Sequence, residues 1–127
     1  MSKTLPDILN TGFKIDEPKL WAIKNIPIEE ISIAQLNSNL DIEYLEKLGS
    51  DDWDLSPRML IENFERETFH ADKVRKADIS YPIEIYFHKN TWIILDGVHR
   101  FTKMVQLGYE TIQVRKISRE VAELVKR

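Results

Sequence analysis

The chain has 127 residues, of which 43% are hydrophobic and 31% charged, and this length and composition suit one globular domain. The formal net charge of −3 argues against general nucleic-acid binding, and the absence of cysteine excludes disulfides, thiolate metal sites and thiol chemistry. No apolar run approaches the roughly 20 residues of a membrane span, and the polar start of the chain lacks the apolar core of a signal peptide. We therefore expect a cytoplasmic protein.

The charge is unevenly distributed along the chain. Residues 1–60 hold six basic and eleven acidic side chains, whereas residues 61–127 hold twelve basic and ten acidic ones. A local site for a small anion in the second half fits this distribution better than a long basic track for nucleic acid does. A solvated surface with a chance asymmetry is the alternative.

The N-terminal segment, residues 1–19, is polar and is interrupted by Pro6, Gly12 and Pro18. Breaks of this kind prevent one long helix or strand. We expect a partly flexible N-terminal arm here and the folded domain over residues 20–127.

Three short elements are predicted next. The apolar-rich residues 20–28 favour a first strand, with Pro27 at an edge or at the end of that strand. Residues 31–36 fit either a strand or a short helix. Residues 41–49 favour a short helix that has Asp41 near its N-cap.

A longer helical region is predicted in the middle of the chain. Ser56 and Pro57 are typical of an N-cap followed by the first helical turn. The helical pattern then continues, with a break, to about Ala77.

The second half alternates strands and helices. A half-buried strand over residues 83–88 is followed by a two-residue turn, Lys89 and Asn90, and by a partner strand over residues 91–95. The remaining predicted elements are a helix over residues 98–107 that stops at Gly108, a strand over residues 111–117, and a terminal helix over residues 119–126 capped by Ser118. This order predicts an α+β domain with a small mixed sheet flanked by helices.

The most informative stretch is Asp96-Gly97-Val98-His99-Arg100, where an apolar strand ends and a helix begins. The free N–H groups at the start of a helix attract anions, and Gly97 lets a ligand approach the backbone. His99 and Arg100 can both carry positive charge, and Lys103 is their neighbour on the helix surface. Gly97, Val98, His99, Arg100 and Lys103 are therefore the candidate ligand-binding residues.

Asp96 has several roles open to it. It can cap the helix, coordinate Mg²⁺ or orient His99. The alternative for the whole stretch is an ordinary turn, with Asp96 as N-cap and with His99 and Arg100 merely exposed.

Residues 94–100, followed by Gly108 and by residues 111–114, resemble the ParB/sulfiredoxin-like superfamily. Its pattern is a strand, Asp-Gly-x-His-Arg, a helix ending in glycine, and a further strand. Residues 81–85 are similar to the proline-led strand that precedes the hairpin in this family. The close resemblance covers residues 77–117, and a looser one reaches back to Ile26. Residues 78–83 and 92–97 are also similar to a small single-domain branch of the superfamily.

The resemblance implies that nucleotide phosphates bind at the turn. Sulfiredoxins place a reactive cysteine between the glycine and the histidine, where this chain has Val98, so reduction of sulfinic acids is excluded. Chromosome-partition members also carry a helix-turn-helix domain and a dimerising tail. The 127 residues hold neither, so we do not expect a partition role.

A branch of free-serine kinases has a similar turn with a doubled histidine, the first of which is replaced here by Val98. By this resemblance Asp96 positions the substrate or Mg²⁺, and His99 and Arg100 hold phosphates. A glutamate near the first strand acts as the base, for which Glu29 and Glu30 are the candidates. Their alternative role is that of exposed loop carboxylates.

The sequence thus predicts a small cytoplasmic domain that binds a nucleotide or another phosphate ligand at the turn. The implied cofactor is Mg²⁺ with ATP, ADP or CTP, and phosphotransferase or nucleotidase activity is the natural chemistry. The candidate catalytic residues are Asp96, His99 and Glu30. The rivals are a non-enzymatic interaction module with the same fold and a DNA-associated accessory protein, so the sequence leaves open whether the chain is an enzyme.

Overall fold

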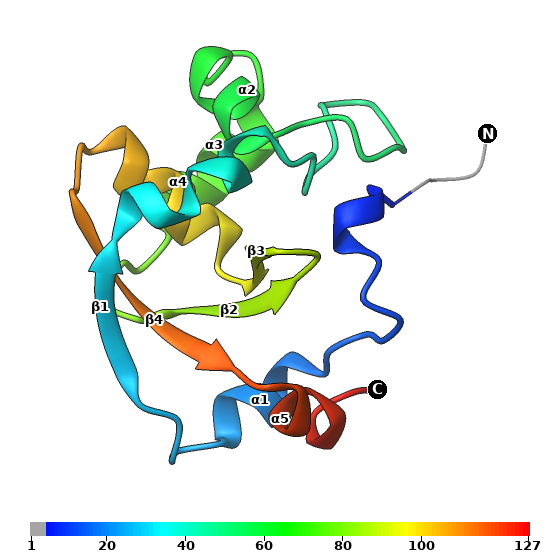
Figure 1. Ribbon diagram of the computed structural model, residues 1–127. Helices are drawn as coiled ribbons and strands as arrows, with labels where there is room; N and C mark the ends of the chain where they lie inside the picture. The colour runs from blue at the N-terminus through cyan, green and yellow to red at the C-terminus, as the bar shows by residue number, and fades with distance from the viewer. Residues whose placement is uncertain (1–4) are drawn as a thin grey trace.

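A four-stranded mixed sheet organises the chain, which the computed structural model describes from residue 5 to residue 127 (Figure 1). The strands are β1 (Ile28–Ser32), β2 (Ile83–His88), β3 (Thr91–Asp96) and β4 (Thr111–Ile117). The α-helices are α1 (Glu17–Ala22), α2 (Pro57–Glu62), α3 (Thr68–Lys76), α4 (Val98–Gln106) and α5 (Arg119–Leu124), and two 3₁₀ helices are η1 (Asp7–Leu9) and η2 (Ile33–Asp41). The predicted α+β class and mixed sheet are confirmed.

The strand order is β1-β4-β2-β3. β4 pairs antiparallel with β1 and parallel with β2, while β2 and β3 form an antiparallel hairpin. The parallel pair needs a crossover, which α4 provides between β3 and β4. This crossover starts at the Asp-Gly turn and so fixes the turn at the end of β3.

The sheet is covered on both faces. One face packs against η2 and α2–α4, through side chains such as Ile85, Val114 and Phe101. The other packs against α1 and α5, through side chains such as Tyr86, Ile117 and Leu20 (Figure 1). Because helices cover both faces of the sheet, Ile83 to Tyr86 of β2 are buried on both faces, and only the end of this strand, with Phe87, is exposed. The predicted half-buried strand was wrong in this respect.

The first strand was predicted too early in the chain. Residues 17–22 form helix α1, whose N-cap Asp16 accepts a hydrogen bond from the Lys19 N–H at 3.3 Å, and Pro18 lies in its first turn. β1 begins only at Ile28. The prediction that Pro27 lies at a strand end is confirmed, because it directly precedes this edge strand.

The predicted helix over residues 41–49 is absent. Asp41 is instead the last residue of η2, which follows β1 directly and explains the ambiguous pattern of residues 31–36. The chain then runs extended and bridges Leu45 to Leu55. Both leucines are buried in the core, so tertiary packing overrides the local helical pattern.

Most other predicted boundaries are confirmed. Ser56 and Ser118 cap α2 and α5 by accepting hydrogen bonds from main-chain N–H groups at 3.2 Å. Lys89 and Asn90 have φ values of +50° and +65°, as a two-residue hairpin turn requires.

The N-terminal arm was predicted over residues 1–19. Its first four residues lie outside the part of the chain that the structure describes. Further along the arm, Ile15 is buried and forms an isolated bridge with Lys126. Packing therefore continues across the expected boundary at residue 20. None of the helices in residues 5–127 combines the length and the apolar character that a membrane span needs.

The packing of α1 can be tested with Leu20, which is fully buried. We expect Leu20→Ala to lower the free energy of unfolding by about 2–5 kcal/mol, because the truncation leaves a cavity beneath α1. Urea denaturation measures this loss. Leu124→Ala is the control, since Leu124 is 73% exposed and its loss should change stability little. Equal effects of the two substitutions would show that α1 does not pack as described.

Candidate functional site

The turn between β3 and α4 is built around Gly97. This residue has a φ of +109°, and an added Cβ would lie 2.6 Å from Cγ2 of Ile83, so only glycine fits here. Gly97 also occupies the N-cap position, without any side-chain cap. The proposed capping role of Asp96 is therefore wrong. The first hydrogen bond of the helix runs from the Phe101 N–H to the Gly97 carbonyl, which leaves the three preceding N–H groups without a partner in the helix.

Asp96 joins three parts of the fold. Its Oδ2 accepts hydrogen bonds from Nε1 of Trp21 at 2.8 Å and from Nη2 of Arg100 at 3.0 Å. Arg100 also donates from Nη1 to the Pro82 carbonyl at 2.7 Å. Both side chains are mostly shielded from solvent, so Arg100 is neither merely exposed nor free to hold a phosphate with both amino groups.

His99 is neutral at physiological pH. Its Nε2 lies 3.0 Å from Nδ1 of His70 in α3, and the two rings stack. Burial, assisted by His70 and the charge of Lys73, lowers the pKa of His99 to about 4. The sequence identified His99 as a group able to carry positive charge, and its burial against His70 disfavours that charge.

The lysine predicted for the site points elsewhere. Lys103 donates from Nζ to the carbonyls of Arg75 and Ala77, at 2.8 and 2.9 Å, where α3 ends. It therefore binds the C-terminal end of α3, as cations at helix C-termini do. Lys73, also from α3, lines the space in front of the turn instead.

A cavity of about 420 Å³, here called the turn cavity, lies at the start of α4. Its walls are the turn itself, from Leu95 to Arg100, together with Leu45, Lys73 of α3, and Ala77, Asp78 and Tyr81 from the loop that follows α3. The free N–H groups at the start of the helix and the positive charge of Lys73 favour an anion here, whereas the carboxylates of Asp78 and Asp96 in the same wall oppose one.

A second cavity of about 620 Å³, here called the α1 cavity, lies on the other side of Asp96 and Arg100. Its walls are mainly apolar, and the side chains that form them include Trp21, Ile23, Ile26, Ile28 and Pro82. Tyr81, Asp96 and Arg100 line both cavities. The Asp96–Arg100 ion pair thus stands between the two spaces.

Glu84 is the buried acid of the α1 cavity, with only 2% of its surface exposed. The sheet register places it opposite Asp96 on β3 and opposite Arg115 on β4. Burial, together with the negative charge of Asp96, raises the pKa of Glu84 to about 7, and the two carboxyl groups share a hydrogen bond. Glu84 therefore holds a proton up to neutral pH.

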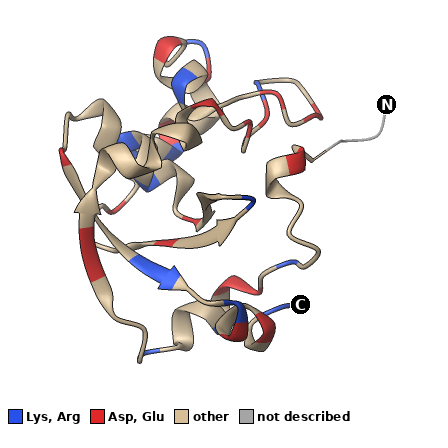
Figure 2. Cartoon of the chain, in the orientation of Figure 1, with Lys and Arg blue, Asp and Glu red and all other residues tan. Residues whose placement is uncertain are grey.

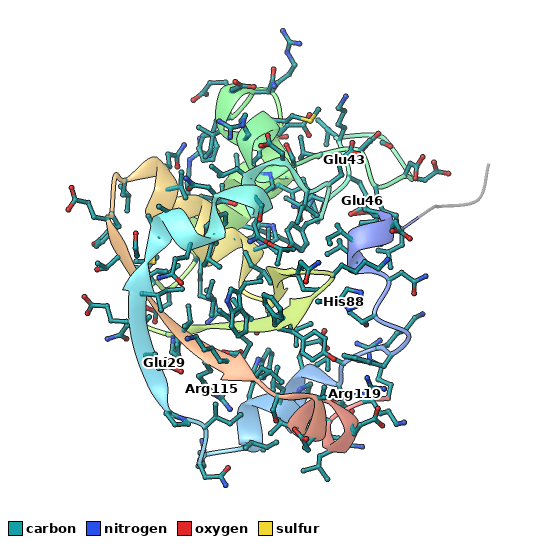
Figure 3. The ribbon with its side chains drawn as sticks, in the orientation of Figure 1. Glu29, Glu43, Glu46, His88, Arg115 and Arg119 are labelled. Atoms are coloured by element: carbon teal, nitrogen blue, oxygen red, sulfur yellow. The ribbon has the colours of Figure 1, made fainter. Side chains whose placement is uncertain are left out.

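The predicted base Glu30 is not brought to the turn. It lies on the edge strand β1, exposed and opposite Gln113, and it lines neither cavity. Its neighbour Glu29 pairs with Lys116 of β4 at 3.2 Å. Figure 2 shows an acidic stretch of β1 beside a basic stretch of β4, and Figure 3 shows Glu29 and Arg115 on these two strands.

Sequence reasoning missed three site residues, namely His70, Lys73 and Glu84. His70 and Lys73 come from α3, and no sequence spacing links that helix to a turn more than twenty residues later. Glu84 stood at a polar position of an alternating strand. Only the packing of the α1 region over this face of the sheet shows that the position is buried.

The residues around Asp96 do not form a site for a resident Mg²⁺ ion. Oδ2 of Asp96 already accepts two hydrogen bonds, and the Arg100 guanidinium beside it repels a divalent cation. Residues 5–127 contain no group of three or more His, Cys, Asp or Glu side chains placed to hold a metal. A cation at this site would need its ligands from a bound phosphate and water.

No known protein family, no curated protein and no solved structure gives a match to this chain. The argument for function therefore rests on the geometry of the turn and of the two cavities.

Gly97 can be tested by substitution. We expect Gly97→Ala to destabilise the protein by about 2 kcal/mol or more, because a positive φ and a collision with Ile83 act together. Gly49→Ala is a matched control, since Gly49 has a similar positive φ of +82° but an open surrounding. Thermal and urea denaturation compare the two variants. Equal losses would mean that the close approach to Ile83 has no energetic weight.

Glu84 should make stability depend on pH. Because its pKa is raised from 4.5 in the unfolded chain to about 7, the stabilisation is complete below pH 4.5 and is lost as the pH rises through 7. The expected loss is on the order of 3 kcal/mol.

Urea denaturation between pH 5 and pH 8 measures this loss. Glu84→Gln should remove the dependence, whereas Glu30→Gln, on the exposed edge strand, should retain it. A wild-type slope that persists in Glu84→Gln would contradict the assignment.

Proposed function

We propose that this chain binds a nucleotide or another small phosphate compound, with a phosphate group in the turn cavity. The observation that carries this proposal is that Lys73 and the residues whose N–H groups start α4 line one cavity. Anions bind at helix N-termini because the N–H groups and the helix dipole both favour negative charge. The ParB/sulfiredoxin-like fold, suggested by the motif around Gly97, is part of the same proposal.

The two cavities favour a ligand with two unlike parts. The turn cavity suits the anionic group, and the α1 cavity, with walls such as Trp21, Ile26 and Pro82, suits an apolar organic group. A nucleotide has both parts. Asp96 and Arg100, which line both cavities, would then lie along the middle of the bound ligand.

Glu84 rather than Glu30 is the acid–base candidate of this site. Because it lines the α1 cavity and not the turn cavity, it would act on a hydroxyl group of the ligand that lies in the α1 cavity and not on the phosphate itself. Glu84 lies in the wall of the α1 cavity and its pKa is about 7, which is the range in which a group both gives and takes a proton under physiological conditions. Glu30 lies on the edge strand, outside both cavities.

The proposal is tested by isothermal titration with ATP, ADP, CTP, GTP and inorganic phosphate, each with and without Mg²⁺. We expect binding of at least one nucleotide. We also expect Lys73→Met to weaken that binding about tenfold or more, because one charge-assisted hydrogen bond is lost.

Lys76→Met is the matched control. Lys76 lies on the same helix, is largely exposed and pairs with Asp72, so its removal should leave the affinity unchanged. Arg100→Ala is a poorer probe because it would also release Asp96. A folded protein that binds none of these compounds at millimolar concentration would exclude the proposal and favour an interaction module.

A further inference from the structure

The packing of α3 against α4 brings two histidines into direct contact. Nδ1 of His70 lies 3.0 Å from Nε2 of His99, and His70 is only 5% exposed. A neutral imidazole has one N–H and one lone pair, so one ring of a neutral pair must donate and the other accept. Which ring donates is decided by the other contact of His70.

His70 also makes a hydrogen bond to the main chain of Glu46, and this bond favours the protonated imidazole. A bond of that kind is donated by the ring to a carbonyl oxygen. Since Nδ1 of His70 faces His99, the donor to Glu46 is Nε2. Nδ1 of His70 then carries the lone pair, Nε2 of His99 donates to it, and the lone pair of His99 is on Nδ1.

The residue that carries this lone pair is part of the turn cavity. His99 lines the cavity together with Lys73, while its Nε2 is taken by His70. Within residues 5–127, every fully buried side-chain nitrogen or oxygen has a hydrogen-bond partner. None of the protein contacts described above uses Nδ1 of His99, so this nitrogen is the one left for a ligand.

We infer that His99 offers a hydrogen-bond acceptor to the turn cavity, fixed in this tautomer by His70 and the Glu46 carbonyl, and that the ligand carries a donor beside its anionic group. This inference rests on the proposed function. The charged groups around the pair are Lys73 on α3, Glu67 at the start of α3, Glu46 and Asp96. His70 acts as a positioning residue.

The arrangement separates oxyanions of the same shape. The helix N–H groups and Lys73 donate to any tetrahedral anion, whereas Nδ1 of His99 requires a donor. Phosphate at neutral pH keeps a P–O–H group that can donate. Sulfate has only acceptors and would set an oxygen against the lone pair.

The tautomer is tested first, on the ligand-free protein at pH 7, by long-range ¹H–¹⁵N correlation spectra of the imidazole rings. We expect protonated Nε2 and unprotonated Nδ1 in both His70 and His99. The opposite tautomer of His99 would overturn the inference, whatever the protein binds.

The ligand preference is tested by titrating the protein with inorganic phosphate and with sulfate at equal ionic strength. We expect phosphate to bind about tenfold more tightly or better. His99→Phe should abolish the preference, because it keeps a ring and removes both nitrogens. His88→Phe is the control and should retain it, since His88 lies on β2 with its Nε2 3.0 Å from the Asn10 carbonyl oxygen (Figure 3).

The outcomes separate the inference from the function on which it rests. Equal binding of phosphate and sulfate by the wild-type protein would overturn the inference and leave the proposed anion site intact. Binding of neither ion, nor of any nucleotide, at millimolar concentration would overturn both.

Discussion

The site depends on one carboxylate oxygen. Oδ2 of Asp96 holds the indole of Trp21 and the guanidinium of Arg100, and Arg100 in turn holds the Pro82 carbonyl at the start of β2. The contact therefore ties α1, the β3–α4 turn and the central strand together. It also stands between the two cavities and places a negative charge beside Glu84, which adds to burial in keeping that acid protonated.

This constraint changes which groups provide the chemistry of the turn. Arg100 is committed to protein acceptors, and His99 is neutral because it is buried against His70. In the proposed function, the groups that attract an anion in the turn cavity are instead the helix N–H groups and Lys73. The turn cavity is thus lined by several hydrogen-bond donors, the helix N–H groups and Lys73, and by our inference Nδ1 of His99 adds an acceptor to them.

Local patterns predicted those elements whose signals lie within a few residues. The β2–β3 hairpin, α4 and β4 follow from alternation, from a two-residue turn and from glycine at both ends of one helix. The failures lie where distant contacts decide. The end of α1 was predicted as a strand because the sequence shows its apolar residues but not what they pack against. Residues 41–49 have a helical pattern but do not form a helix, because Leu45 and Leu55 are buried in the core instead.

The sequence by itself determined the turn, in which a strand ends in Asp-Gly and a helix starts directly after it. That only glycine fits at position 97 follows from the contact with Ile83, which is tertiary. Only the tertiary structure decided what surrounds the turn, because His70, Lys73, Glu84 and Trp21 reach it from α3, β2 and α1. Burial and neighbouring charge set the protonation of these groups, and both arise when separate elements pack together. For this reason the sequence located the candidate site, whereas its charge and its buried acid, Glu84, followed from the fold.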